Sequence, residues 1–341
     1  MTTILDVARE AGVSKSTVSM VINNNPKVKI DTKYKVLSVI EKLGYVPNIS
    51  AVELTTKRKQ NIGVIRFQKA ELKNSFDGDP YTYFQDVASG IYRELQNSSY
   101  GLLLEEVATN TDGTCQIPQI IKTNRVEGIL IVGGVFDKQF IDEIYKKTPS
   151  LVVLGVDYPD VDCVSTDSKF ATYSGIKYLI DNGHRDILFI NGPKITASTY
   201  MKEEGYKLAL MEAGISFRKA RYRKSPFSGT GGYDAIKDAL NEDQTLPTAV
   251  FTGSDSISSG VLRYLYEQRL MVPEDISVAT FDDSILTEYG TPPLTSVNMN
   301  KELIGIEGYK ALLNRIENPD TERKFVIVPY KIIDRGSVKK I

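Results

Sequence analysis

Cysteine is scarce in this sequence, and its scarcity excludes several kinds of site. Two cysteines occur in 341 residues, Cys115 and Cys163. They lie far apart and form no Cys-x-x-Cys pattern, so neither a zinc site nor a disulfide framework is indicated. The hydrophobic content of 41% and charged content of 25% are typical of a globular chain. We therefore expect inert or buried thiols and no metal site.

Histidine is scarcer still, which argues against an enzyme. The single histidine, His184, lies in a Gly-His-Arg turn directly before an apolar segment. General acid–base catalysis needs a partner group within reach, and no such partner is indicated. The glycine-rich stretch 229–232 lacks both the P-loop lysine and the Gly-x-Gly-x-x-Gly spacing of nucleotide-binding turns. We expect no catalytic residue and no cofactor.

Long apolar runs are also absent. No segment approaches the roughly 18–20 apolar residues that span a membrane. The first residues show no basic region followed by an apolar stretch, which a signal peptide would have. We therefore expect a cytoplasmic protein.

Charge is present in balanced amounts but is unevenly distributed. Residues 1–60 contain 10 basic and 5 acidic side chains, which leaves 32 basic and 38 acidic side chains in the rest of the chain. The first segment therefore carries a net charge of +5 and the remainder −6. This asymmetry is expected when only one end of a chain meets nucleic acid phosphates.

The basic segment contains three short helical patterns. Gly12 separates the first from the second, Ser14 is suited to cap the second, and Asp31-Thr32 is suited to cap the third. Two short helices joined at a glycine turn predict a helix-turn-helix, whose second helix enters the DNA major groove. The apolar residues expected to form its core are Ile4, Val7, Ala8, Ala11, Val18, Val21, Ile22, Val36, Leu37, Ile40 and Leu43.

These motifs resemble the LacI/GalR family of bacterial transcription regulators. The order D-V-A-x-x-A-G-V-S, T-V-S, N-N, G-Y-x-P-N and A-x-x-L carries the resemblance through residue 54. In that family the segment after Pro-Asn forms a hinge helix on DNA, and a leucine from it wedges into a minor-groove base step. By position that leucine is Leu54.

Two residues depart from the family pattern. Met20 and Val52 stand where the family usually has arginine, which removes two expected phosphate or base contacts. We expect an unusual operator, or weaker binding that depends on Lys15 and on the basic run 57–59. Lys15 and Ser16 are expected to read bases. The full set of expected DNA-binding residues is Thr3, Ser14, Lys15, Ser16, Thr17, Ser19, Met20, Asn23, Tyr45, Asn48, Ala51 and Leu54.

From residue 61 onward, short apolar segments alternate with helical patterns. This alternation predicts βαβ units with buried parallel strands, and there are enough units for two doubly wound lobes. The resemblance implies the periplasmic-binding-protein-like arrangement, an α/β core of two parallel-sheet lobes. We expect a helix-turn-helix domain at 1–46, a hinge and linker at 47–60, and an effector-binding and dimerisation core at 61–341. The first lobe is expected at about 61–160 and 290–320, and the second at about 161–289 and 321–341.

The core of this family binds a small molecule between its lobes, at the carboxyl ends of the strands. Asp255 and Asp282 each follow an apolar segment, where carboxylates suit sugar hydroxyls, although helix capping would explain such residues equally well. Lys202 replaces an arginine found in many sugar-responsive members and lacks its planar fork. The motif Asp79-Pro80-Tyr81 is similar to that of galactose-repressor-like members. The expected effector-binding residues are Asp79, Tyr81, Tyr83, Asp157, Ser198, Lys202, Phe227, Ser254, Asp255 and Asp282.

The resemblance implies a homodimeric repressor of carbohydrate-utilisation genes. Its partners would be a near-palindromic double-stranded DNA operator and a sugar or sugar phosphate effector. A regulator activated by a corepressor or a phosphoprotein, like purine repressors or catabolite control proteins, is an open alternative because sequence does not show the sign of allostery. An exported sugar-binding protein is a remote alternative, because it would share the core but lack the first sixty residues.

Overall fold

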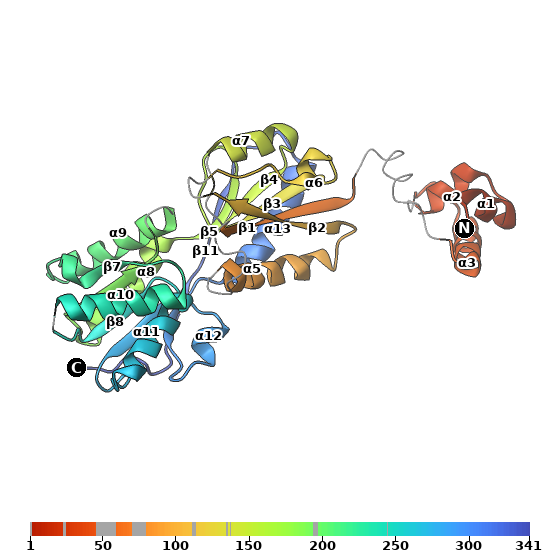
Figure 1. The fold of residues 1–341 in the computed structure, drawn as a ribbon. Coiled ribbons are helices and arrows are strands. Elements are labelled where there is room, and N and C mark those ends of the chain that lie inside the picture. The colour runs from red at the N-terminus through yellow and green to blue at the C-terminus, as the bar shows by residue number, and fades with distance from the viewer. Residues whose placement is uncertain are drawn as a thin grey trace. The chain divides into compact units, whose positions relative to one another are not determined.

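A computed structural model describes residues 2–22, 25–45, 59–69, 80–110, 114–133, 136, 138–193, 197–243 and 245–341, without the side chains of 68–69 and 80–82. The chain divides into two compact units, Met1–Lys59 and Gln60–Ile341 (Figure 1). We call the first the headpiece and the second the core, and each is described by itself.

The headpiece contains the three helices that its apolar spacing predicts, α1 (Ile4–Ala11), α2 (Lys15–Ile22) and α3 (Ile30–Leu43). Thr3 and Asp6 form a reciprocal capping box that starts α1, and Gly12 ends it in the left-handed conformation at φ 63°. Val7, Ala8, Ala11, Val18, Val21 and Val36 form the buried core.

Two details of the third helix differ from the sequence-based prediction. The N-cap residue is Lys29, which makes no side-chain cap hydrogen bond, so the Asp31-Thr32 cap is wrong. Leu37, expected in the core, is 41% exposed. The small core is closed mainly by Val36, with Ile40 and Leu43 packed at its margin.

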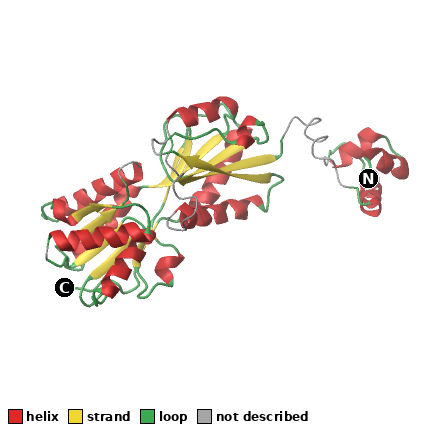
Figure 2. Ribbon diagram, viewed as in Figure 1, coloured by secondary structure: helices red, strands yellow, loops and turns green. Residues whose placement is uncertain are grey.

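The first sheet of the core has the strand order β11-β5-β4-β3-β1-β2, and its neighbouring strands run parallel. Helices cover both of its faces (Figure 2). We call this sheet and its helices the first lobe. Its strands are β1 (Asn61–Lys69), β2 (Gly101–Thr109), β3 (Gly128–Val132), β4 (Leu151–Leu154), β5 (Asp162–Thr166) and β11 (Phe325–Val328), and its helices are α5 (Pro80–Leu95), α6 (Gln119–Lys122), α7 (Lys138–Lys147) and α13 (Lys301–Glu317).

The second sheet has the order β12-β10-β9-β8-β6-β7, and with its helices it forms the second lobe. Its strands run parallel except for the edge strand β12, which pairs antiparallel with β10. The strands are β6 (Ile187–Asn191), β7 (Tyr222–Lys224), β8 (Ala249–Thr252), β9 (Ser277–Asp282), β10 (Thr295–Asn298) and β12 (Lys331–Ile333). The helices are α8 (Ser168–Asp181), α9 (Ala197–Glu212), the 3₁₀ turn Lys219–Arg221, α10 (Gly229–Glu242), α11 (Asp255–Glu267) and α12 (Ile285–Glu288).

The chain passes between the lobes at residue 167, at 299–300 and at 329–330, as the strand assignments require. These passages lie several residues later than the boundaries expected near 160, 289 and 320. Strands β5 and β11 belong to the first sheet and β10 to the second, because each pairs in register with strands of that sheet. The apolar pattern alone did not show which sheet these short strands would join.

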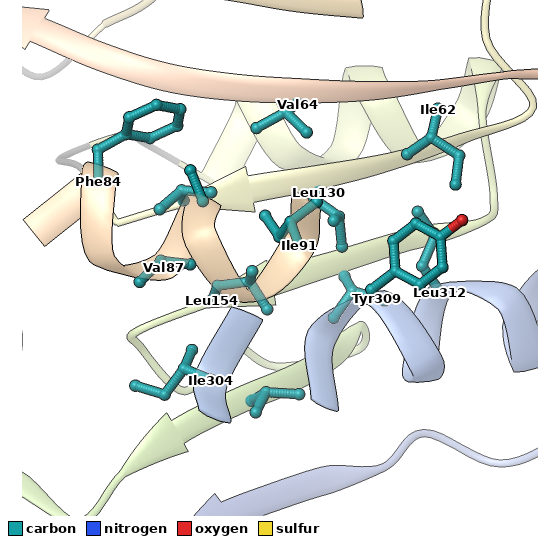
Figure 3. Packing of buried hydrophobic residues seen from close by; sticks show 14 of the residues in the cluster. Ile62, Val64, Phe84, Val87, Ile91, Leu130, Leu154, Ile304, Tyr309 and Leu312 are labelled. Carbon is teal, nitrogen blue, oxygen red and sulfur yellow. The ribbon is translucent and has the colours of Figure 1, made fainter. Parts of the chain in front are cut away.

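The core of the first lobe follows the two-residue period of its strands. Leu130 and Val132 point to one face with α5 and α13, while Ile129 and Ile131 point to the other with α6 and α7. Figure 3 shows the first of these clusters, to which α5 contributes Ile91 and α13 contributes Leu312.

Glycines allow α5 and α13 to pack closely. A Cβ atom on Gly305 would lie 2.0 Å from the carbonyl oxygen of Val87, and one on Gly90 would lie 2.0 Å from that of Glu302. No larger residue fits at either position unless the helices separate. The packing of α13 therefore depends on glycine at Gly305 and on the facing Gly90.

Candidate DNA interface and ligand site

The amino end of α2 presents a polar, exposed surface. Ser14, Lys15 and Ser16 are exposed, while Thr17, Ser19 and Met20 are half-buried. The Ser14 hydroxyl accepts a hydrogen bond from the Thr17 main-chain N–H at 3.1 Å, so this side chain is also the helix cap. Lys15 is the cationic side chain on this surface. The geometry is that of a helix whose first turn can enter a groove.

Two other expected DNA-binding residues have structural roles in the headpiece. The Thr3 hydroxyl donates to the Asp6 carboxylate at 2.7 Å, and Thr3 itself is exposed. Tyr45 is half-buried and packs at the margin of the headpiece core. Asn23, Asn48, Ala51 and Leu54 lie outside the described residues, as do Val52 and the basic residues 57–58 of the hinge.

Polar and aromatic side chains gather at the carboxyl edge of the second sheet. Strands β9, β8 and β6 are neighbours, so the ends Asp282, Thr252 and Asn191 lie along one edge. Asp282 is 6% exposed and has a φ of 104°, a conformation rare outside glycine. Backbone held in such a conformation commonly marks a functional position.

Lys202 lies within this edge rather than on its surface. It is 4% exposed, and its ammonium donates to the Gly253 carbonyl at 2.7 Å. The same ammonium lies 3.8 Å from the centre of the Phe281 ring. Lys202 therefore ties α9 to the ends of β8 and β9, and its expected contact with an effector hydroxyl stays a prediction.

Phe227 lies against the end of β6. A Cβ atom on Gly192 would lie 2.2 Å from the Phe227 ring, so the aromatic side chain occupies space that only glycine leaves open. Phe227 is half-buried, and its ring centre is 5.9 Å from the Lys202 ammonium. Ser198, in the first turn of α9, is also half-buried near this strand end.

Ser254 and Asp255 support the edge from within. Both are 0% exposed. Ser254 caps α11, and Asp255 accepts hydrogen bonds from the Thr280 hydroxyl at 3.1 Å and the Ser284 N–H at 2.5 Å. These bonds join the start of α11 to the loop after β9. Ser254 is the N-cap of α11, so helix capping, the alternative left open for Asp255, is not the role of Asp255.

The first lobe places Tyr83 at the carboxyl ends of its own strands. A Cβ atom on Gly155, directly after β4, would lie 2.1 Å from the Tyr83 hydroxyl oxygen, and one on Gly133, after β3, would lie 3.5 Å from its ring. Tyr81 belongs to the same helix, but its side chain is not described, and Asp79 lies outside the described residues.

Asp157 does not join this group. Its exposed carboxylate is ion-paired with Arg323, which precedes β11 and also donates to the Val161 carbonyl at 2.7 Å. Arg323 and Asp162 line a small polar pocket at the amino ends of β4 and β5. Asp157 therefore lies toward the opposite edge of the first sheet from Tyr83.

Comparison with known proteins identifies this combination of units. Residues 3–48 match the family described as bacterial regulatory proteins, lacI family, and residues 176–338 match the periplasmic binding protein-like domain. Over 341 residues the chain is 32% identical to catabolite control protein A of Priestia megaterium, covering 99% of both sequences.

The chain belongs to the LacI family. It is also 30% identical over 345 residues to the ribose operon repressor of Escherichia coli K12, covering 99% of this chain and all of the relative. Among solved structures, a complex of the transcriptional regulator CelR with cellobiose superposes with a TM-score of 0.72 at 27% identity, covering 99% of this chain and 100% of the other. The chain is accordingly a DNA-binding transcriptional repressor whose core is a ligand-binding domain.

Sequence reasoning missed several polar residues at this strand edge and near the junction of the lobes. Asn191 is fully buried, and its amide donates to the Thr199 carbonyl at 2.9 Å. The sequence did contain a sign of this role, because Asn191 is a polar residue that directly follows the apolar run 187–190. Lys301 and Asp86 were also missed. They meet only because α13 packs on α5 from more than 200 residues away, which no local pattern reveals.

Proposed function

We propose that this repressor controls carbohydrate-utilisation genes and that a small sugar, bound between the lobes, sets its affinity for DNA. The observation that carries this proposal is the cluster of Phe227, Lys202 and Asp282 at adjacent strand ends. Aromatic faces and carboxylates are groups that suit sugar rings and hydroxyls. The cellobiose complex of one relative and the name of the ribose operon repressor support the same class of ligand.

Each residue has a role in this proposal. Phe227 stacks on the sugar ring, and Asp282 accepts hydrogen bonds from hydroxyl groups. Ser198 adds a polar contact, and Tyr83, with Tyr81 and Asp79, approaches from the first lobe. Lys202, Ser254 and Asp255 hold the carboxyl ends of the strands in place, because their polar atoms form hydrogen bonds to other parts of the protein.

The headpiece would read a near-palindromic operator as one half of a homodimer. Lys15 and Ser16 contact base edges from the first turn of α2, while Thr17, Ser19 and Met20 lie nearer the DNA backbone. Thr3, Ser14, Asn23, Tyr45 and Asn48 complete the phosphate and groove contacts. In the hinge, Ala51 and Leu54 enter the minor groove, where a leucine wedge bends the duplex.

An exposed apolar patch on α12 supports pairing of two cores. Ile285 is 66% exposed, Leu286 43% and Tyr289 75%. Three such side chains in one short segment commonly mark a protein contact. Sedimentation of the full chain should give a dimer, and Tyr289→Lys should shift it toward the monomer. A monomeric wild-type chain at micromolar concentration would contradict the pairing.

The protein acts where the DNA is, so we place it in the cytoplasm and assign it no catalytic activity. Among the described helices, none is both long and apolar enough to cross a membrane.

The effector either weakens or strengthens DNA binding. The similarity to catabolite control protein A keeps a partner-activated regulator as the alternative to a sugar-released repressor.

A DNA-binding measurement tests the proposal. Operator DNA would be selected from a random pool by the full chain, and binding would be measured with and without sugars that raise its melting temperature. A stabilising sugar that weakens binding supports the sugar-released repressor, and one that strengthens it supports the alternative. If only nucleobases or amino acids stabilise the chain, the sugar proposal is wrong. Leu54→Ala should weaken operator binding while sugar binding stays intact.

A further inference from the structure

Lys301 is a buried cation at the junction of the two lobes. It is the first residue of α13 in the first lobe and follows the passage at 299–300 that leaves the second lobe. Its side chain is only 5% exposed. A charged group is rarely buried this deeply without carboxylate partners or a ligand.

One carboxylate contacts the Lys301 ammonium, and carboxylates of the other lobe act on it from farther away. Its nitrogen lies 2.5 Å from the Asp86 carboxylate on α5. Burial lowers the pKa of Lys301, but the charges of Asp282, Asp86 and Asp255 outweigh burial and raise it, so the ammonium stays protonated. Asp86 belongs to the first lobe, while Asp255 and Asp282 belong to the second.

The ion pair with Asp86 leaves hydrogen-bonding capacity on Lys301. An ammonium carries three N–H donors, and besides the close Asp86 carboxylate no hydrogen-bond partner of the Lys301 nitrogen is found in the part of the chain that the structure describes. The ammonium can therefore donate to an oxygen that is not part of the fold. Asp282 ends β9 and pairs in register with Asn298, three residues before Lys301, at the edge of the proposed sugar site.

A hydroxyl group suits this arrangement better than an anion. A hydroxyl oxygen accepts a hydrogen bond from an ammonium and, through its own proton, donates one to a carboxylate. A ligand carboxylate or phosphate could accept from Lys301 but has no proton for Asp282. It would also add negative charge beside three carboxylates in a site of low dielectric constant.

We propose that Lys301 binds the effector directly, and that its ion pair with Asp86 and its position close to the end of β9 at Asp282 select an uncharged, hydroxyl-rich sugar over the corresponding sugar acid or sugar phosphate. This inference rests on the sugar-binding function proposed above and narrows it. A ligand hydroxyl then connects Lys301 of the first lobe to Asp282 of the second.

Matched pairs of probes test the charge selectivity on the full chain. Calorimetry would compare D-galactose with D-galacturonate, D-glucose with D-glucose 6-phosphate, and D-ribose with D-ribose 5-phosphate. The uncharged member that binds should do so at least tenfold more tightly than its anionic counterpart. Equal or tighter binding of the anion would overturn the inference while leaving the sugar-responsive function intact. If an anionic probe binds and its uncharged counterpart does not, only the inference is overturned; if none of the six probes binds, both proposals are overturned.

Variants assign the selectivity to named residues. Lys301→Met should weaken binding of the uncharged sugar about tenfold or more, the usual effect of losing a charge-assisted hydrogen bond. Asp86→Asn removes one negative partner and should shift the preference at least threefold toward the anion, a change that general destabilisation does not produce. Lys310→Met is the matched control, because this exposed lysine of the same helix pairs with Glu307. Unchanged affinity in Lys301→Met, or an unchanged preference in Asp86→Asn, would overturn the inference.

Discussion

The hydroxyl group of Thr166 donates a hydrogen bond of 2.8 Å to the main-chain carbonyl of Met299. Thr166 ends the last β-strand before the first passage between the lobes, and Met299 lies in the second passage. Thr166 is 3% exposed and Met299 4%, so water does not readily replace this bond. Two passages of the chain that are far apart in sequence are thereby held together.

Removing this hydroxyl should loosen the junction. Thr166→Val keeps the shape of the side chain but leaves the Met299 carbonyl without this donor, which should cost about 1–3 kcal/mol of unfolding free energy. Urea unfolding of the core, followed by circular dichroism, measures the loss. Thr166→Ser retains the hydroxyl and should lose clearly less, so equal losses in both variants would contradict the assigned role.

Lys15 should dominate recognition by the headpiece. Lys15→Ala should weaken binding to DNA selected by the wild-type protein by roughly 1–3 kcal/mol, the value of one good base contact. Fluorescence anisotropy measures both this change and the binding of unrelated DNA, which should change less. Lys42→Ala is the matched loss of one positive charge, because Lys42 pairs with Glu10 away from α2. Equal effects of the two variants would mean that Lys15 acts only through net charge.

The contact of α13 with α5 should not tolerate a methyl group. Gly305→Ala would place a Cβ atom 2.0 Å from the Val87 carbonyl oxygen and force the helices apart. We expect a loss of about 1–3 kcal/mol, as for other overpacked cores. Thermal unfolding measures it, with Lys310→Ala on the exposed part of the helix as the control, which should change stability little. An unchanged midpoint in Gly305→Ala would show that the helices adjust without strain.

His184 should make the core sensitive to mild acid. Its side chain is 0% exposed, and burial holds its pKa below the ordinary value. The unfolded chain therefore binds the proton more readily than the folded chain. Stability linked to this group is complete above about pH 6.5 and is lost as the pH falls from there toward the folded-state pKa.

The test compares unfolding midpoints at pH 7.5 and 5.5. Because His184 is the single histidine, His184→Gln removes all histidine titration from the chain. The midpoint of the wild-type core should fall more than that of the variant over this interval. Parallel curves would show that other groups cause the pH dependence.

Local patterns predicted the elements, while contacts distant in sequence determined the site. The short apolar segments expected to form strands include 128–132 and 151–154, which are β3 and β4 in the structure, because buried parallel strands are apolar throughout. The headpiece followed from the spacing of its apolar residues and from Gly12. Periodicity of this kind depends on neighbours within one element.

Local patterns did not predict the contacts that the candidate site residues make in the fold. Lys202 and Asp157 were chosen by position in a motif, yet one is buried against Phe281 and the other pairs with Arg323. Lys301 was not chosen at all, because its burial results from tertiary packing of α13. A motif locates a residue along a strand or loop, but it does not show where the side chain points.

The late position of β11 in the sequence has a consequence for synthesis on the ribosome. The first sheet begins with β1 near residue 61 but needs β11, at residues 325–328, to cover β5 at its edge. The second sheet likewise needs β12, at residues 331–333, to cover β10 at its edge. Neither lobe can be complete until almost the whole chain has been made, whereas the headpiece has all three helices after its first 43 residues. The part that reads DNA is therefore formed on the nascent chain long before the part that controls it.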